Sequence, residues 1–304
     1  MNILVIGGKG FIGKNIVSCL SQNNKVFVAD CINSDDSNYF CVKLEDIDSI
    51  VNIIERCDVQ IVIHLASTII PSSGAEQYIC NMNSIYIPTL KLLDYCAEKH
   101  IKFVYFSSGG AVYGNQTEIF NEYTKREPMS FYGLSKLNFE NLVQFYHRTK
   151  NLQYLIIRPS NPYGHGQNIN GKQGIVAVII GKILKNEIIE IWGDGTAVKD
   201  YIYIDDLVYY FTKLIESGFD SNCWNTIYNI GTGTGHSVND VINAFEKNGI
   251  SLPEVRHIAA AKSDVKRMIL DCTKIQTHFP HNCISLKEGI GMFWNFVKES
   301  YLQM

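Results

Sequence analysis

The chain lacks the features that mark a membrane or nucleic-acid protein. None of its apolar runs approaches the roughly 20 residues that a helix needs to cross a bilayer. Its 27 lysines and arginines are offset by 30 aspartates and glutamates, which leaves a formal net charge of -3 and no basic excess for nucleic acid. No charged leader with a cleavage site precedes the first apolar run, MNILVIGG. We therefore expect a soluble, cytoplasmic protein with neither a membrane nor a nucleic acid as partner.

The cysteines lack the spacing of a metal site or a disulfide framework. There are nine, an odd number, and no two of them form a C-x-x-C pair. Complete internal pairing is excluded, and reduced thiols in a cytosolic protein are the better interpretation. We predict no bound metal.

Short apolar runs alternate with amphipathic stretches through the first half of the chain. The runs predict strands over residues 3–6, 25–30, 60–65, 103–107 and 155–158. The stretches between them predict helices over residues 12–21, 46–56, 86–99 and 132–150. Strands that are apolar along their whole length indicate a parallel sheet covered on both faces. The predicted fold is α/β, with a doubly wound, Rossmann-like sheet.

The pattern loosens after residue 158. Residues 159–173 are rich in glycine, asparagine and proline and predict a loop, followed by a helix over 176–186 and a short strand over 190–192. Residues 227–230 predict a strand that returns to the main sheet. We predict one domain over residues 1–160, with the returning strand near 227–231, and a smaller mixed lobe formed mainly by residues 161–304.

A glycine-rich turn joins the first strand to the first helix. Gly7, Gly10 and Gly13, with Phe11 and Ile12 between the last two, have the spacing of a dinucleotide-binding turn. The first glycine permits the tight turn, the second lets backbone N–H groups approach a pyrophosphate, and the third lets the helix lie close to the sheet. The alternative is a turn with a structural role only.

An acidic residue, Asp30, closes the second predicted strand. A carboxylate there can accept hydrogen bonds from the adenosine ribose hydroxyls and would repel a 2′-phosphate, which favours NAD over NADP. The alternative is an aspartate that caps a turn at the end of a strand.

Tyr132 and Lys136 are four residues apart at the start of the long predicted helix, and therefore share one helix face. The lysine could hold a cofactor ribose while its charge lowers the pKa of the phenol, which would make Tyr132 a usable base. A solvated surface pair is the alternative, because this spacing alone is common.

These motifs occur together with SSGGAVYG at 107–114, RPSNPYG at 158–164, WGDG at 192–195 and KDYIYIDDL at 199–207. In this order they resemble the NAD-dependent epimerase/dehydratase family of extended short-chain dehydrogenases, whose members include UDP-glucose 4-epimerases. The resemblance covers residues 2–274. It implies a NAD-binding first domain and a second lobe that binds a nucleotide sugar.

The resemblance also implies residue roles. Tyr132 would take a proton from a sugar hydroxyl, Lys136 would position the nicotinamide ribose, and the backbone of Leu65 and Ala66 would line the cofactor. Asn161 would contact the nucleotide diphosphate. The helices predicted at 86–99 and 132–150 form a dimer interface in many relatives, which implies a homodimer.

The sequence departs from the family pattern at three positions. Gly109 stands where the family usually has a catalytic serine or threonine, so either Ser108 replaces it or no serine takes part. Lys199 replaces an arginine that neutralises phosphate, and lysine does so as a point charge rather than a bidentate fork. Ala261 replaces a second phosphate arginine, for which Lys262 or Arg267 could compensate.

The function that this combination favours is a NAD-dependent 4-epimerase of a UDP-hexose or UDP-N-acetylhexosamine, acting through a transient 4-keto sugar with Tyr132 as base. The first alternative is a reductase of a nucleotide-linked 4-keto-6-deoxy sugar, and a catalytically silent NAD-binding scaffold is the second. A 4,6-dehydratase is disfavoured because Gly110 and Ala111 occupy the positions of its acidic pair. His165 shows no partner in the sequence and is interpreted as a loop residue.

Overall fold

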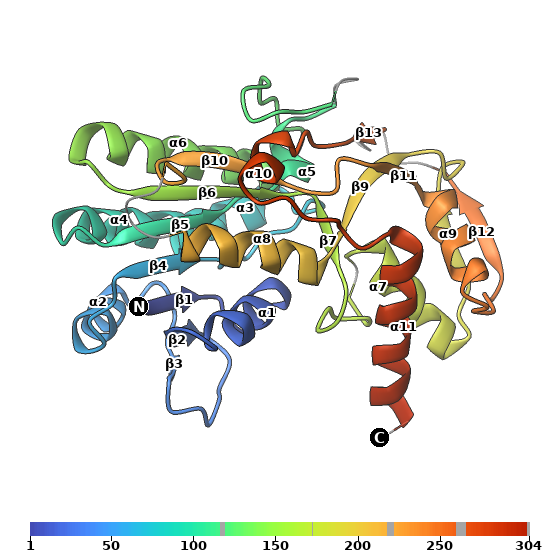
Figure 1. The fold of residues 1–304 in the computed structure, drawn as a ribbon, viewed down its shortest axis with the longest axis horizontal. Coiled ribbons are helices and arrows are strands. Elements are labelled where there is room, and N and C mark those ends of the chain that lie inside the picture. Colours follow the sequence, from blue (N-terminus) through green and yellow to red (C-terminus); the bar gives the residue numbers. More distant parts are fainter. Residues whose placement is uncertain (116–118, 172, 218–221, 260–265, 303–304) are drawn as a thin grey trace. The chain divides into compact units, whose positions relative to one another are not determined.

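The computed structural model describes residues 1–115, 119–171, 173–217, 222–259 and 266–302, and these fall into two compact units. The first unit comprises Met1–Val112, Arg126–Arg158 and Phe211–Tyr228. The second comprises Tyr113–Lys125, Pro159–Tyr210 and Asn229–Met304. Figure 1 shows the elements of both, with the labels used below.

The first unit is built on a seven-stranded sheet. In sheet order its strands are β10 (Thr226–Ile230), β6 (Tyr154–Pro159), β5 (Lys102–Phe106), β4 (Ile61–His64), β1 (Asn2–Ile6), β2 (Lys25–Asp30) and β3 (Tyr39–Cys41). The five pairings from β6 to β3 are parallel. The central strands β1 and β4 are apolar and almost fully buried, as expected for a sheet covered on both faces. The predicted Rossmann-like fold and the returning strand beside β6 are confirmed.

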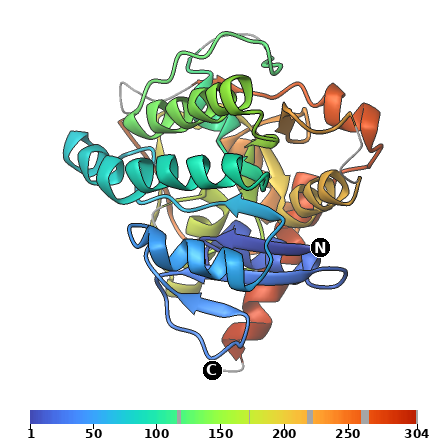
Figure 2. The same cartoon turned by 90° about the vertical axis from the view of Figure 1, so that its left-hand side faces the viewer.

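Helices cover both faces of this sheet. On one face α2 (Ile47–Arg56), α4 (Ile87–Glu98) and α6 (Phe131–Lys150) pack side by side, with α3 (Ala75–Asn81) and a π-helical turn (Met82–Tyr86) leading into α4 (Figure 2). On the other face α1 (Phe11–Leu20) contacts the C-terminal part of α8 (Ile204–Glu216), where Thr212 Oγ1 donates to Cys19 Sγ at 3.4 Å.

Local capping fixes where the long helix α6 begins. The side chain of Ser130 accepts a hydrogen bond from the Gly133 N–H at 3.1 Å and caps the helix. At its other end Asn151 takes the left-handed conformation (φ 57°) that terminates helices. The cap places Tyr132 in the first turn of α6 and Lys136 one turn later.

Several elements were not predicted, and three of them show why. The strand β3 has only three residues, and the α3 segment carries few buried residues, so neither produces a periodic signal. The predicted loop over 159–173 was wrong at β7 (Asn161–Tyr163), which pairs in parallel with β9 (Val198–Tyr203). The hydrogen bonds to β9, about 40 residues later in the chain, make this segment a strand, and the local glycine and proline content gives no sign of them.

The second unit is organised around β9. This strand pairs with β7, with β11 (Gly235–Ser237) and with β13 (Arg267–Met268), and a separate parallel pair joins β8 (Ile189–Trp192) to β12 (Val255–Ile258). The helices are α7 (Ile175–Lys185), the first part of α8, α9 (Val238–Lys247), α10 (Thr273–His278) and α11 (Leu286–Leu302). Ser237 caps α9 through a capping box with Asp240.

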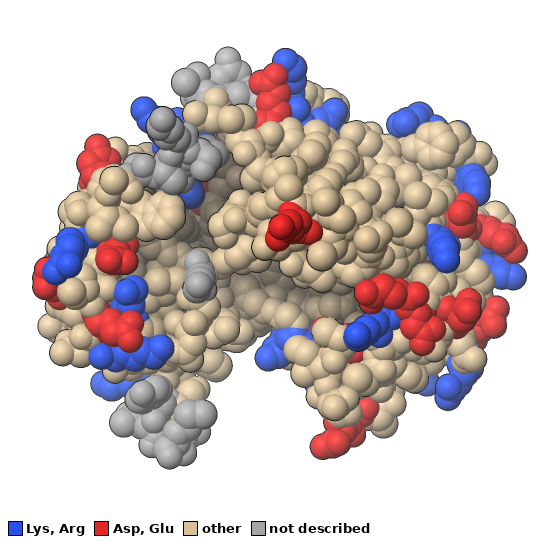
Figure 3. All heavy atoms as spheres, turned by 180° about the vertical axis from the view of Figure 1, so that it is seen from behind, with Lys and Arg blue, Asp and Glu red and all other residues tan. Residues whose placement is uncertain are grey.

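The length and apolar character of the helices and the charges on one face were compared with the expectations from the sequence. Over the residues described, no helix combines the length and apolar character that crossing a bilayer requires. On the face drawn in Figure 3, basic and acidic side chains of the described residues lie interspersed, in keeping with the small net charge.

The glycine turn before α1 provides a stability test. A Cβ at Gly13 would lie 2.5 Å from the Gly7 carbonyl oxygen, whereas a Cβ at Gly10 would lie 3.4 Å from the same atom. Gly13→Ala should therefore lower the free energy of unfolding by about 1–3 kcal/mol, the usual cost of overpacking. Gly10→Ala, as matched control, should change it by less. Urea denaturation of both variants measures the difference, and equal stabilities would contradict the packing role of Gly13.

Candidate active site

The first part of the site is the glycine turn at the carboxyl ends of β1, β2 and β4. The Gly7 N–H donates to the Ala29 carbonyl at 2.9 Å, and a Cβ on Gly7 (φ +82°) would lie 2.9 Å from the Ala66 nitrogen. The structure thus brings the turn against the chain that leaves β4 at Leu65 and Ala66. Gly10 precedes α1 without a side-chain cap, so the first N–H groups of the helix, at Phe11 and Ile12, have no intrahelical acceptor. Such a helix start can bind an anion.

Asp30 closes β2 beside this turn and holds it in place. Its Oδ2 accepts from the Lys9 N–H at 2.9 Å, and its Oδ1 accepts from the Cys31 N–H at 2.8 Å. The structural role left open by the sequence is therefore present. A carboxylate has about four acceptor positions, so two further donors can still be accommodated.

The second part of the site joins the end of β5 to the first turns of α6. Ser108 follows β5, and its side chain hydrogen-bonds the Tyr132 hydroxyl. The Lys136 ammonium donates to the Phe106 carbonyl at 2.8 Å and lies 5.6 Å from the centre of the Tyr132 ring. Lys136 is almost fully buried, so the alternative of a solvated surface pair is wrong for this lysine.

Burial sets the pKa values of these groups. It raises the pKa of Tyr132, and the hydrogen bond from Ser108 lowers it in part. It also lowers the pKa of Lys136 to about 8, against an upward effect of the Glu140 carboxylate. The sequence predicted that Lys136 lowers the pKa of Tyr132. That direction was wrong for this structure, because the cost of burying a phenolate outweighs the favourable contacts.

Three buried residues near this site were missed by the sequence analysis. The Glu140 carboxylate and the Arg158 guanidinium are fully buried and form an ion pair at 2.5 Å. The i+4 spacing of Glu140 from Lys136 was the available signal. His64 at the end of β4 is also fully buried, with Nε2 2.9 Å from Thr89 Oγ1, and burial lowers its pKa to about 3.

Apart from Tyr132, the predicted substrate residues lie in the second unit. The Asn161 side chain donates to the Asp200 carbonyl at 2.8 Å, and Asn161 pairs with Tyr201 across β7 and β9. Since side chains alternate along a strand, Asn161 and Lys199 share a face. Arg267 pairs with Val198, one residue before Lys199, and so projects from the opposite face. The two cations are not brought together, while Ala261 and Lys262 fall outside the described residues.

His165 has a partner that the sequence did not reveal. Its Nε2 lies 2.7 Å from Asp205 Oδ1, in the first turn of α8. The partners are 40 residues apart in the chain, so no local spacing indicates the pair.

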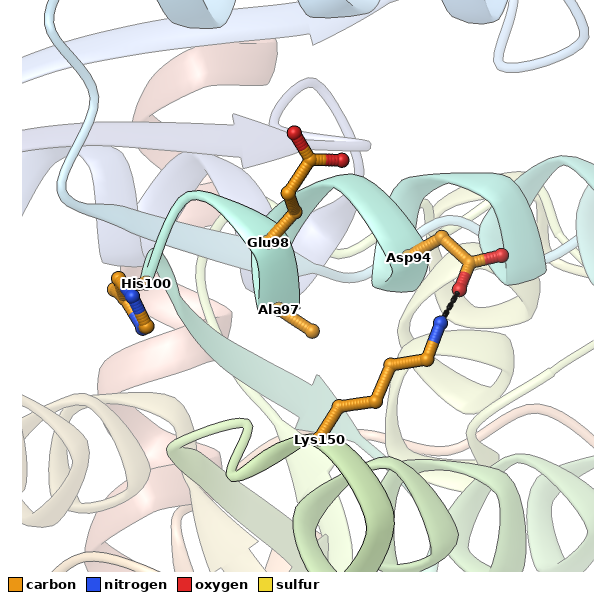
Figure 4. A pocket seen from close by; sticks show the side chains of 5 residues that line it. All are labelled: Asp94, Ala97, Glu98, His100 and Lys150. Carbon is orange, nitrogen blue, oxygen red and sulfur yellow. Dashed lines mark hydrogen bonds and ion pairs between the residues drawn. The ribbon is translucent and has the colours of Figure 1, made fainter.

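A surface pocket at the C-terminal ends of α4 and α6 has no comparable chemistry. Asp94, Ala97, Glu98, His100 and Lys150 line it, and Lys150 forms an ion pair with Asp94 (Figure 4). Both partners are about half exposed, so the pair contributes little energy. Among the residues described, we find no cluster of three or more histidine, cysteine or acidic side chains that could hold a metal.

Comparison with known proteins identifies the family. Residues 3–231 match the model of the NAD dependent epimerase/dehydratase family. The chain belongs to this family.

Two curated members of the epimerase/dehydratase family resemble the chain along most of its length. A candidate UDP-glucose 4-epimerase of Methanocaldococcus jannaschii is 33% identical and covers 98% of this chain and 99% of its own. The dTDP-4-dehydro-6-deoxyglucose reductase of Escherichia coli is 31% identical over 80% of each chain.

Solved structures of the family show the same fold. The UDP-glucose 4-epimerase of Thermotoga maritima, solved with UDP-glucose, is 30% identical with a TM-score of 0.89 and covers 99% of this chain and 100% of its own. The UDP-glucose 4-epimerase of Thermus thermophilus, solved with NAD, is 28% identical with a TM-score of 0.86 and covers 98% of this chain and 99% of its own.

The contact between Ser108 and Tyr132 predicts a titration shift. Ser108→Ala removes the hydrogen bond that lowers the pKa of Tyr132, so this pKa should rise further. NMR titration of protein carrying 13C-labelled tyrosine measures it, and Tyr132→Phe assigns the resonance. An unchanged midpoint in Ser108→Ala would show that the serine does not act on the phenol.

Proposed function

We propose that the protein is a cytoplasmic, NAD-dependent 4-epimerase of a nucleotide sugar, with a UDP-hexose or UDP-N-acetylhexosamine as substrate. The observation that carries the proposal is the Ser108–Tyr132 hydrogen bond beside the buried Lys136 ammonium. The likeness to UDP-glucose 4-epimerases over nearly the whole chain supports the substrate class.

The residues of the first unit fit NAD. The close approach of Gly7 to Ala66 leaves no room for a side chain between the turn and the exit of β4. The uncapped N-terminus of α1 offers N–H groups to a pyrophosphate, and the remaining acceptor capacity of Asp30 suits ribose hydroxyls. We assign the cofactor to Gly7, Gly10, Phe11, Ile12, Gly13, Asp30, Leu65, Ala66 and Lys136. When bound, NAD supplies a reversible hydride acceptor.

The chain's own part in the reaction is to move a proton and to hold charge. Tyr132 removes the proton of the sugar C4 hydroxyl as the 4-keto sugar forms, and returns it after the sugar has presented its other face. Ser108 orients the phenol through its hydrogen bond. The Lys136 ammonium stabilises the phenolate that is left when the proton has gone, because an opposite charge favours the ionised form. Asn161 and Lys199 share a face and are proposed to bind the diphosphate.

A second candidate is a reductase of a nucleotide-linked 4-keto-6-deoxy sugar. The 31% identity to the Escherichia coli dTDP-4-dehydro-6-deoxyglucose reductase favours it. The same proton donor would serve, but each turnover would consume NADH or NADPH, whereas epimerisation is redox-neutral.

Turnover without added cofactor tests the proposal. The purified protein should interconvert UDP-glucose and UDP-galactose, or their N-acetyl forms, with its resident NAD, as measured by proton NMR of the sugar. Tyr132→Phe should lower kcat by about 10²- to 10⁴-fold, the usual contribution of a general acid–base group.

The matched control removes a phenol hydroxyl at an exposed position. Tyr123→Phe should leave kcat unchanged, because Tyr123 is 89% exposed. A folded protein that converts none of these sugars, yet oxidises NADH in the presence of a dTDP-4-keto-6-deoxy sugar, would replace the epimerase by the reductase.

The first unit also supports a proposed homodimer. Large apolar side chains are exposed on α3, α4 and α6, which pack together on one face of the sheet (Figure 2). They include Ile79, Ile87, Leu134 and Phe145, of which Ile79 is 61% and Phe145 50% exposed. Exposed apolar patches of this kind mark interfaces between proteins.

Charge placed on this face should dissociate the dimer. The double variant Ile87→Glu/Phe145→Glu should elute with the mass of one chain in light scattering coupled to size exclusion, while the wild type elutes with twice that mass. Ile32→Glu is the matched control, because Ile32 is also exposed but lies outside these helices. A wild-type protein of single-chain mass would refute the interface.

A further inference from the structure

A buried acid on α6 is not used by the proposed proton transfer. Glu140 is fully buried, and each of its carboxylate oxygens is engaged. Oε1 accepts from Ser107 Oγ at 2.5 Å and from Arg158 Nε at 2.9 Å, and Oε2 accepts from Arg158 Nη2 at 2.5 Å. The carboxylate therefore ties together α6, the end of β5 and β6.

Glu140 is connected to the site in two ways, through Lys136 and through Ser107. Glu140 lies one turn after Lys136 on α6, and helical side chains lean toward the N-terminus, so Glu140 projects toward the lysine. Lys136 in turn donates to the carbonyl of Phe106, the residue before Ser107. Ser107 precedes Ser108, which hydrogen-bonds Tyr132. One buried side chain thus contacts the chain segment that carries Ser108 and faces the ammonium beside Tyr132.

We propose that Glu140 is a positioning residue for the proton transfer, which fixes Ser108 through Ser107 and serves as the counter-charge of the Lys136 ammonium. This role rests on the proposed function of Tyr132 and Lys136. Glu140 itself touches neither the sugar nor the cofactor in this scheme. Its effect should therefore be seen in kcat rather than in KM.

The charge environment of Lys136 is defined by groups on four elements. His64 on β4 is neutral, since burial lowers its pKa to about 3. Tyr105 on β5 has its ring centre 5.2 Å from the ammonium, and Tyr132 lies on α6. Arg158 on β6 is paired with Glu140. Glu140 is the charged group that raises the pKa of Lys136 against burial.

The direction of the pH effect follows from these groups. Burial holds the pKa of Lys136 at about 8, and Glu140 opposes that lowering. Without the carboxylate the pKa falls further, so the ammonium is lost at lower pH. The alkaline decline of kcat should then begin about one pH unit lower, which corresponds to a pKa change of one unit.

The experiment compares three variants of the full-length protein. Glu140→Gln removes the charge and deprives the buried Arg158 guanidinium of its carboxylate partner, which can destabilise the fold. Glu140→Leu/Arg158→Met replaces the whole pair by apolar side chains, a change that often leaves stability intact. Glu140→Asp keeps the charge. Thermal melting, kcat and KM against pH, and NMR titration of 13C-labelled lysine are measured for each, with Lys136→Arg assigning the Lys136 resonance.

We expect the double variant to recover the melting temperature while its Lys136 midpoint and its alkaline limb stay about one pH unit lower than in the wild type. Glu140→Asp should recover part of the wild-type profile. Recovery of both stability and pH profile in the double variant would show that the pair only holds the fold, and would overturn the proposal.

The NMR titration separates this proposal from the proposed function. A protein that epimerises no sugar would refute the function, but a lowered Lys136 midpoint in the double variant would still support the counter-charge role. An unmoved midpoint would refute that role whatever sugar the protein converts.

Discussion

The ion pair between Glu140 and Arg158 constrains the part of the first unit on which the chemistry depends. Burying two charges is costly, and the bidentate geometry together with the Ser107 hydrogen bond offsets that cost only if α6, β5 and β6 keep their relative positions. A slide of α6 along the sheet would leave a buried charge without its partner. The register of Tyr132 and Lys136 against the end of β5 is therefore specified by this pair and by the Ser130 cap at the start of the helix.

The glycine turn shows how one local arrangement can serve both folding and binding. Asp30 accepts from the Lys9 N–H and so fixes the turn before any ligand is present. Gly7 adopts a positive φ and lies against Ala66. A turn held in this way loses little further conformational entropy when a pyrophosphate binds. Such pre-organisation favours binding. The structural and cofactor-binding interpretations of Asp30 are thus compatible.

The sequence predicted the strands and helices of the first unit well, because burial on both faces gives each central strand an uninterrupted apolar run. The glycine turn, Tyr132 and Lys136 were found because their spacing is fixed by local geometry. The sequence could not predict β7, His165 with Asp205, or Glu140 with Arg158, since each depends on residues 18 to 40 positions apart. It also gave the wrong direction for the pKa of Tyr132, because burial is a property of the packed structure and outweighs what a neighbouring lysine suggests.

Burial of both groups has a consequence for proton transfer that neither pKa shows by itself. Desolvation disfavours an isolated phenolate at Tyr132, and it equally disfavours an isolated ammonium at Lys136. When Tyr132 is ionised, its phenolate lies beside the Lys136 ammonium in a medium of low dielectric, where their attraction is stronger than in water. The two groups then titrate as a coupled pair, because the pKa of each depends on the charge of the other. Burial therefore raises the pKa of Tyr132, while the low dielectric strengthens the attraction between Lys136 and the phenolate, the form that accepts the sugar proton. Glu140 contributes to the same coupling, because its negative charge raises the pKa of Lys136 and so favours the ammonium form.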